Sequence, residues 1–386
     1  MPLRGDRGKF NPAPRDGMVL GGARGLGDRA GHEPLRVAVR ADASSAIGTG
    51  HVLRAMAVFE PLRRSGGTVV FVCREAPGHL IDLVGERGFA ARAIPDDPDP
   101  LRDAAATRAA LAPDVAGGGP FDWLWVDHYG LDRRFEEAVG DAARAVAVMD
   151  DLADRPHAAR LLVDPAHPAD RASVHDGLVP EGALRLVGPD YVPLRAEFTE
   201  AGPPVRTPGE PVRRVLVTLG GNDPLDTTGL VLDALDTPEL AHLALDVTAG
   251  TSNPRLEALR ARAARMPNVA LHVQHPRPSG LMAAAQLCVG AGGTTSWERC
   301  YMGLPTLGLV LADNQVAFMA ELERLGVVRS LGWANRLGAS VLRDEIVRAI
   351  GDGAWRAGCT ERGRTVVDGR GVQRILDALW TNRTRP

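Results

Sequence analysis

The hydrophobic positions between residues 35 and 151 form short apolar runs, separated by segments whose apolar residues recur at helical spacing. The apolar runs read LRVAVRA, TVVFVC, FAARAI, DWLWVDHYG and AVAVMDD. Short strands that alternate with helices are typical of a parallel sheet with helices on both faces. The pattern therefore predicts a doubly wound α/β domain over residues 35–196.

A stretch rich in proline, glycine and charge, residues 197–212, interrupts this alternation and is typical of a linker between domains. A second series of apolar runs follows: RRVLVTLGG, LALDVTAG, NVALHV, LCVGAGG and PTLGLVLA. The last helices, up to Trp380, have no obvious strand after them, and we leave open whether they pack back on the first domain. We expect residues 213–386 to form a second domain. The fold class is thus α/β, with two doubly wound Rossmann-like domains facing a cleft at the carboxyl ends of both sheets.

Residues 1–34 show no convincing element, and we expect a disordered leader there. Gly21, Gly25 and Gly27 have the spacing of a dinucleotide-binding turn. That turn needs a strand before it and a helix after it, whereas here a glycine and a proline interrupt the segment where the helix should run. We therefore do not interpret these glycines as a dinucleotide site.

The composition of the 386 residues narrows the class of protein. The net charge of −3 and the absence of a polybasic run argue against nucleic acid or a membrane surface as partner. Lys9 is the only lysine, which argues against Schiff-base chemistry and a phosphate-binding lysine. The four cysteines match no disulfide or zinc pattern, and no apolar run is long enough to span a membrane. We expect a cytoplasmic, monomeric protein.

Three glycine-bearing junctions lie where a predicted strand leads into a predicted helix. Glycine lets backbone amides approach an anion, and the free amides of a helix start favour phosphate. Each junction could also be an ordinary tight turn, in which threonine caps the helix. Three of them in one chain favour a nucleotide diphosphate on the second domain. The candidate ligand-binding residues are Gly48 and Gly50 at the first junction, Gly220, Gly221, Asn222 and Asp223 at the second, and Gly292, Gly293, Thr294 and Thr295 at the third.

Three further polar residues belong to the same predicted edge of the second domain. Glu298 follows the third junction by about one helical turn and could accept hydrogen bonds from a ribose, or simply complement the helix dipole. Asn314 and Gln315 follow another strand and suit sugar hydroxyls or amides, or a helix cap.

His51 directly follows the glycines of the first junction, and we predict that it is the catalytic residue. Imidazole can accept a proton from water at neutral pH. Asp127, His128 and Tyr129 end a neighbouring strand at the same edge, where Asp127 or Tyr129 could orient His51 or contact substrate. Asp42, just after the first strand, is another candidate for orienting it. A histidine in this place could also be a helix cap or a packed residue.

Two clusters of aspartates in the sequence are candidates for metal ligands. Asp96, Asp97 and Asp99 lie in a proline-rich, loop-like segment, whereas Asp150 and Asp151 end a strand but have no evident second ligand cluster. We therefore expect a site without metal or other cofactor, in which helix ends and arginines hold the phosphate charge.

At this point the motifs RADASSAIGTGHVLRAMAV, VDHYGLD, VTLGGNDP and GAGGTTSWERCYMGLPTLGLVLADNQ strongly resemble a known family. It is the family of UDP-2,4-diacetamido-2,4,6-trideoxy-β-L-altropyranose hydrolases of pseudaminic acid biosynthesis, which supply a surface-glycan precursor. The likeness runs in order from about Leu35 to Val328. The family is similar to the GT-B glycosyltransferases, including the enzyme that adds N-acetylglucosamine to lipid-linked muramyl pentapeptide.

The resemblance implies a GT-B fold and a small-molecule UDP-sugar substrate. It implies that His51 activates water for attack at the anomeric carbon without metal, and that the nucleotide lies on the GGND and GAGGTTSWE motifs. Two alternatives remain: a GT-B glycosyltransferase that uses a UDP-amino sugar, and a protein that binds nucleotide sugars without turning them over.

Overall fold

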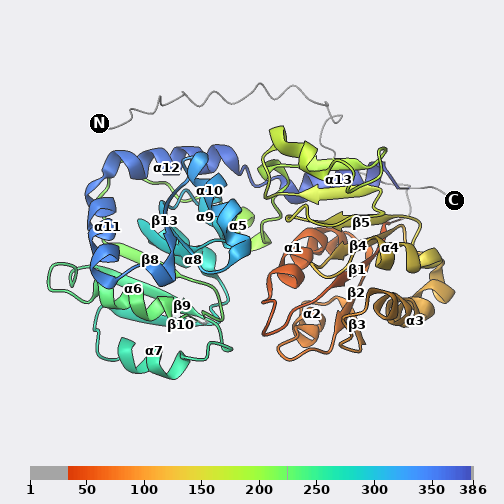
Figure 1. Cartoon of the computed structure of the whole chain (residues 1–386), viewed down its shortest axis with the longest axis horizontal. Helices are drawn as coiled ribbons and strands as arrows, with labels where there is room; N and C mark the ends of the chain where they lie inside the picture. Colours follow the sequence, from red (N-terminus) through yellow and green to blue (C-terminus); the bar gives the residue numbers. More distant parts are fainter. Residues whose placement is uncertain (1–33, 224, 384–386) are drawn as a thin grey trace. The chain divides into compact units, whose positions relative to one another are not determined.

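The computed structural model describes residues 34–223 and 225–383, so nearly all of the predicted leader 1–34, including Gly21, Gly25 and Gly27, lies outside the described residues. The described chain contains two parallel sheets, shown in Figure 1. The predicted fold class, two doubly wound Rossmann-like halves, is confirmed.

The first sheet has the strand order β3-β2-β1-β4-β5-β6-β7, and every pairing in it is parallel. Its strands are β1 Arg36–Ala41, β2 Thr68–Arg74, β3 Ala90–Ile94, β4 Trp123–Asp127, β5 Val146–Met149, β6 Leu161–Asp164 and β7 Leu184–Val187. Its helices are α1 Gly50–Arg64, α2 Ile81–Glu86, α3 Pro100–Gly118 and α4 Arg133–Ala138. Strands β6 and β7 were not predicted, because the segments around them lack the helical repeat that alternates with the other strands.

The second sheet has the order β10-β9-β8-β11-β12-β13 and is also parallel throughout. Its strands are β8 Arg214–Thr218, β9 Ala244–Ala249, β10 Val269–Val273, β11 Leu287–Ala291, β12 Thr306–Val310 and β13 Val328–Trp333. The helices of this half are α6 Thr227–Leu235, α7 Leu256–Ala263, α8 Pro278–Ala284, α9 Thr295–Tyr301, α10 Val316–Arg324, α11 Ala339–Gly351 and α12 Gly353–Val366. Strand β13 was missed, since its sequence VRSLGW is only partly buried and carries polar residues.

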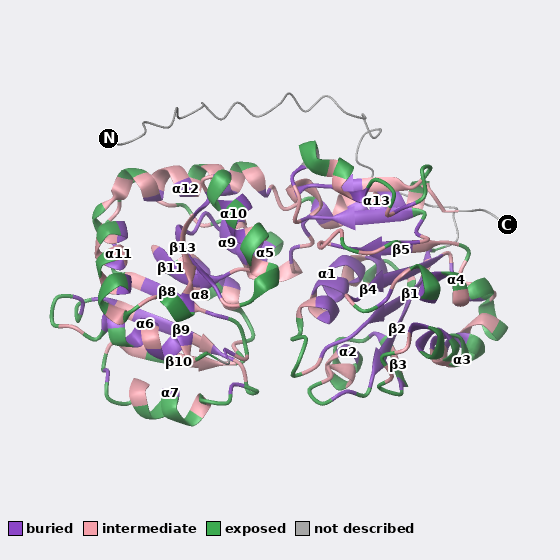
Figure 2. Cartoon of the chain, viewed as in Figure 1, coloured by how far each residue is buried: buried purple, intermediate pink, exposed green. Residues whose placement is uncertain are grey.

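The central strands of both sheets are buried on two faces, which explains why they are almost continuously apolar. In the first half, α3 and α4 pack on one face, and Phe59 of α1 meets Trp125 of β4 on the other. In the second half, α6 and α11 cover one face and α8 the other. Figure 2 shows the strands buried and the outer helices exposed on their solvent sides.

Two segments connect the halves along the chain. Within the predicted linker 197–212, the chain is helical as far as Ala201, where α5 (Ala196–Ala201) ends. The last helix, α13 (Gly371–Thr381), packs against α1, and the Trp123 indole donates a hydrogen bond to the carbonyl of Leu379 in it. Of the C-terminal helices, α13 thus packs back on the first half of the chain and covers its sheet.

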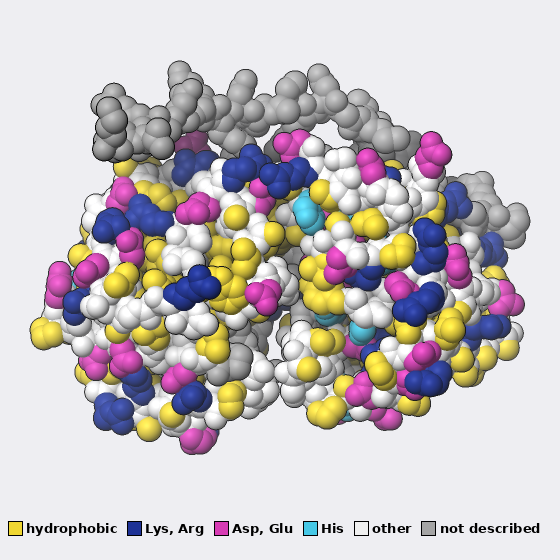
Figure 3. Space-filling model, viewed as in Figure 1, with side chains coloured by type: hydrophobic (Ala, Val, Ile, Leu, Met, Phe, Trp, Pro, Cys, Tyr) yellow, Lys and Arg dark blue, Asp and Glu magenta, His cyan; other side chains and the backbone are white. Residues whose placement is uncertain are grey.

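Among the described helices, none combines the length and the apolar character that a bilayer-spanning segment needs. On the face drawn in Figure 3, acidic and basic side chains are interspersed.

Candidate functional site

A row of four aspartates follows the carboxyl edge of the first sheet. Asp42 comes just after β1, Asp127 ends β4, Asp150 follows β5 and Asp164 ends β6. These strands are neighbours in the sheet, and their registers pair Ala41 with Asp127 and Met149 with Val163. The four carboxylates are therefore held at one edge, where open parallel sheets bind ligands. All four are buried, so each needs a partner for its charge.

Asp127 binds both His51 and Arg54 of α1. The Nδ1 atom of His51 lies 2.6 Å from Oδ1 of Asp127. Arg54 donates from Nε to Oδ2 at 2.7 Å and from Nη2 to Oδ1 at 2.6 Å. His51 and Arg54 are three residues apart and so share one face of the helix, which brings both onto the end of β4.

The charge on Asp127 fixes the hydrogen-bonding state of His51. Burial alone would raise the pKa of Asp127, but the charge of Arg54 and the hydrogen bonds from Arg54 and His51 lower it to about 2. An ionised carboxylate can only accept, so Nδ1 of His51 carries the proton and donates it. Nε2 of a neutral His51 is then the free acceptor, the state that a general base requires.

The other candidates on this edge have different surroundings. The Tyr129 ring stands edge-on to His51 with 4.4 Å between the centroids, and burial together with nearby Asp151 raises the pKa of its hydroxyl, which stays protonated. His128 lies 3.3 Å from Asp42, and its pKa is lowered mainly by burial. Asp42 itself is bound by Arg40 and by the amide of Arg74. Asp127, rather than Asp42, is thus the carboxylate that orients His51.

A pocket of about 420 Å³ opens in front of His51 and is lined by both halves of the chain. From the first half, the predicted residues in its wall are Gly50, His51 and Tyr129. From the second half they are Gly220, Gly221, Gly292, Gly293, Thr294, Thr295, Glu298, Asn314 and Gln315. Six predicted residues lie outside the lining: Asp42, Gly48, Asp127, His128, Asn222 and Asp223.

The loop between β11 and α9 needs its glycines for two different reasons. Gly293 has φ of 137°, a conformation that favours glycine. A Cβ on Gly292 would lie 3.1 Å from the Cβ of Gln315, so glycine allows the two loops to meet. Thr294 makes no side-chain bond to cap its helix. Its hydroxyl is therefore not used as a helix cap and remains available to a ligand.

Two residues of the GGND motif have structural partners. The carboxylate of Asp223 accepts hydrogen bonds from the amides of Thr227 and Thr228 at 2.9 and 2.7 Å, and so caps helix α6. The side chain of Asn222 donates to the carbonyl of Ser45 at 3.2 Å. The sequence motif could not distinguish these roles from ligand contacts, because both use the same polar residues after a glycine turn.

Glu298 is buried in the wall of the pocket and paired with Arg195. Arg195 donates to both carboxylate oxygens, from Nε at 2.8 Å and from Nη2 at 3.1 Å. Burial raises the pKa of Glu298, and the charge of Arg195 opposes that rise. Nearby, Gln315 accepts the amide of Leu311 at 2.9 Å, which turns the chain after β12 toward the pocket.

The sequence reasoning missed several residues of the wall. Arg54 was detectable, because it follows His51 by three residues on the same predicted helix. Arg195 lies in the segment before α5, and only the fold brings it to Glu298. The apolar lining was also missed, notably Leu53, Leu194, Trp297 and Phe318.

Four of the acidic residues that could be metal ligands form an ion pair or cap a helix. Asp97 pairs with Arg102, and Asp99 caps α3. Asp150 pairs with Arg155 and Asp151 with Arg54.

Comparison with known proteins gives distant relatives, and no family model matches the chain. The spore coat polysaccharide biosynthesis protein SpsG of Bacillus subtilis is 30% identical over 201 residues, which cover 52% of this chain and 59% of SpsG. The chain thus spans less than two thirds of that relative. The UDP-2,4-diacetamido-2,4,6-trideoxy-β-L-altropyranose hydrolase of Campylobacter jejuni is 24% identical over 248 residues, which cover 64% of this chain and 81% of the hydrolase.

Among solved structures, MurG of Acinetobacter baumannii aligns with a TM-score of 0.59 at 16% identity, over 90% of this chain and 100% of MurG. Identity at this level shows the fold alone. The chain has the GT-B architecture, and it is distantly related to the hydrolase and to SpsG.

Proposed function

We propose that this protein hydrolyses a UDP-linked diacetamido-trideoxyhexose, UDP-2,4-diacetamido-2,4,6-trideoxy-β-L-altropyranose, to UDP and the free sugar. The observation that carries the proposal is the His51–Asp127 pair at the wall of a pocket whose opposite wall is made of glycine loops. The motifs shared with the hydrolase family and the distant similarity to the C. jejuni enzyme support this choice of substrate.

In the proposed reaction, His51 acts as the general base. Its Nδ1–H donates to Asp127, so Nε2 accepts a proton from a water molecule. The water oxygen attacks the anomeric carbon as the bond from that carbon to the bridging oxygen breaks, and UDP leaves with the electron pair. Asp127 stabilises the imidazolium that forms, while Arg54 keeps Asp127 ionised. UDP is a stable anion, so its departure needs little acid assistance.

The second half would bind the nucleotide. Amides of the Gly220–Gly221 and Gly292–Gly293 turns and the Thr294 hydroxyl are suited to the diphosphate. Glu298 is suited to the ribose hydroxyls, since Arg195 positions its carboxylate and leaves each oxygen able to accept a further bond. Asn314 and Gln315 line the same pocket and are suited to the sugar hydroxyls or its amides.

The test is UDP release from a panel of UDP-amino sugars without any acceptor. The proposal expects release from the diacetamido sugar by the wild type and strongly reduced release by His51→Asn. A glycosyltransferase of the same fold would release UDP at a useful rate only when an acceptor is added. A binding protein would hold the UDP-sugar and release none.

A further inference from the structure

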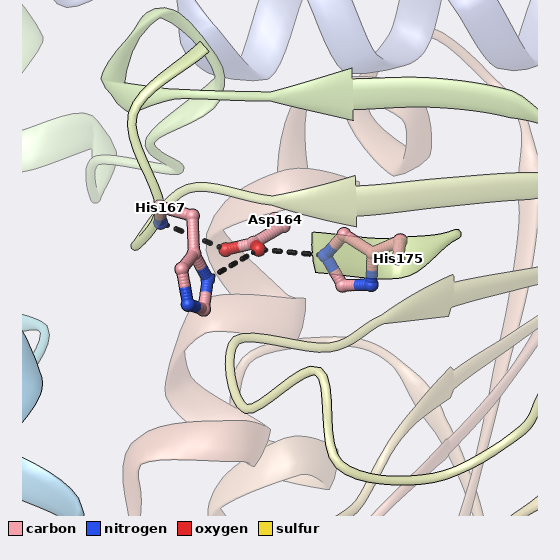
Figure 4. A group of neighbouring side chains, drawn as sticks. All are labelled: Asp164, His167 and His175. Atoms are coloured by element: carbon pink, nitrogen blue, oxygen red, sulfur yellow. Dashed lines mark hydrogen bonds and ion pairs between the residues drawn. The ribbon is translucent and has the colours of Figure 1, made fainter. Parts of the chain in front are cut away.

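Asp164, the last aspartate of the row, is surrounded differently from the other three. Its Oδ2 atom lies 2.7 Å from Nδ1 of His167 and 2.8 Å from Nε2 of His175. Its Oδ1 atom accepts the amides of Ala166 and His167 at 2.9 and 3.1 Å. Figure 4 shows the two imidazoles approaching the carboxylate from opposite sides. Asp164 and His175 are fully buried, and His167 is half-buried.

The difference is one of charge. Asp42, Asp127 and Asp150 each form an ion pair with an arginine. Within residues 34–223 and 225–383, the ion-pair partners of Asp164 are the two imidazoles alone. A buried carboxylate is costly without a compensating positive charge. Here that charge can come only from protonation of an imidazole, and the hydrogen bond to Asp164 raises the pKa of His167. The end of β6 is therefore a place where a bound cation would be stabilised.

The donor set is suited to a particular class of cation. One oxygen of Asp164 and one nitrogen from each histidine lie within 4.8 Å of one another. Two imidazoles and a carboxylate form a mixed nitrogen and oxygen set that binds zinc and similar divalent transition metals, whereas magnesium and calcium prefer oxygen alone. The two amides on Oδ1 fix the carboxylate with Oδ2 toward the histidines, as outer-shell bonds do in metal sites.

We propose that Asp164, His167 and His175 bind one divalent transition-metal ion, with zinc the best match to the ligands. The ion would take the place of the hydrogens that now lie between the imidazoles and Oδ2. Each neutral imidazole would then carry its single proton on the other ring nitrogen, and solvent on the side of half-buried His167 would complete the coordination. Pro165 and Ala166 lie between the first two ligands in sequence and line the pocket. The metal would thus hold this part of the pocket wall against the end of β6. Its ligands are different residues from the proposed water-activating pair, His51 and Asp127.

The test is zinc binding by the full-length chain after treatment with a chelator and dialysis. Titration in competition with a chromophoric chelator should give one zinc per chain, and zinc should raise the melting temperature. Two variants are chosen to keep the fold: His167→Ala changes a half-buried residue, and Asp164→Asn keeps the shape of the buried side chain. Each should weaken zinc binding by at least about 100-fold. The matched control is His242→Ala, which changes an exposed histidine hydrogen-bonded to the carbonyl of Glu239; it should bind zinc like the wild type.

The proposal is overturned if the wild type binds no zinc, or if His167→Ala binds it as tightly as His242→Ala. The cluster would then be a hydrogen-bonded network only. Circular dichroism of each variant separates loss of zinc from loss of fold. Because the readout is metal binding, failure here is distinct from failure to release UDP.

Discussion

At the scale of single residues, the chemistry assigned to this protein depends on what each side chain is bound to. His51 is one of several histidines with a carboxylate partner, and it is the one that lines the pocket. Its partner Asp127 is held ionised by Arg54, so the free ring nitrogen is available as a base.

Replacing His51 with asparagine should lower turnover by about 10²–10⁴-fold, the usual effect of losing a general base. UDP affinity should stay within a few-fold, because the proposed nucleotide contacts lie on the other half of the chain. Steady-state kinetics and calorimetry with UDP measure the two effects, and His242→Asn is the control. Turnover near the wild-type rate would reduce His51 to a structural residue of α1.

Replacing Glu298 with alanine should weaken binding of UDP and of the UDP-sugar by a similar factor, about 10- to 100-fold, the range for bonds to a charged group. A ribose contact is equally strong in the ground state and the transition state, so the effect should be in KM and not in kcat. Glu197→Ala is the matched control, since Glu197 also pairs with Arg195 but lies outside the pocket. Unchanged UDP affinity in Glu298→Ala would remove the ribose contact from the account.

Local sequence patterns could indicate His51 and the glycine turns, because these depend on a strand, a turn and a helix that are consecutive in the chain. Local patterns could not show which side chain or backbone group each of these residues contacts. Arg195 and Glu298 are separated by 103 positions, and the capping role of Asp223 depends on how the chain turns into α6. The prediction that Asp42 could orient His51 failed for the same reason: Arg40 and His128 already surround it.

At the scale of elements, the strongly apolar strands were predictable, since a strand buried on both faces is a continuous apolar run. The four-residue strands β6 and β7 were not, although β6 carries Asp164 and the segment with Pro165 and Ala166 at the pocket. Short strands obtain their structure from pairing with neighbours, which a local pattern does not contain.

Helix α4 and the end of β5 are joined through a buried histidine whose ionisation affects stability. His157 Nδ1 lies 2.6 Å from Glu136, and Nε2 lies 3.4 Å from Asp150. Burial would lower the pKa of His157, but the neighbouring carboxylates of Asp150 and Glu136 raise it to about 9. A histidine whose pKa is raised on folding stabilises the protein fully below its unfolded pKa of about 6.5, and this stability is lost as the pH rises through about 9.

The free energy of unfolding should therefore fall between pH 6.5 and 9 by up to about 3 kcal/mol from this residue. In His157→Gln the free energy of unfolding should fall less over this pH range, by the amount that His157 contributes. This comparison holds whatever the stability of the variant at pH 6.5. Urea unfolding of both proteins across this range measures the difference. Parallel pH profiles would show that His157 is not protonated in the folded protein.

At the scale of the whole molecule, the proposed reaction and the proposed metal use different residues. The proposed reaction centre is His51 with Asp127, and the proposed zinc ligands surround Asp164 on another strand. A chelator should therefore lower the melting temperature but leave UDP release by the folded protein within about 2-fold, measured at 25 °C. If the chelator abolishes UDP release and Mg²⁺ restores it, Asp150 and Asp151 become candidate metal ligands again. If only zinc restores it, the Asp164 cluster takes part in the reaction.

The central claim is that His51 directs water to the anomeric carbon, and hydrolysis in water enriched with heavy oxygen tests it most directly. The account predicts that the label enters the anomeric hydroxyl of the sugar and that UDP stays unlabelled. The sugar must be analysed early, because its free anomeric hydroxyl exchanges slowly with solvent, whereas the UDP readout does not have that problem. Label in the β-phosphate of UDP would mean attack at phosphorus and would contradict the role given to His51.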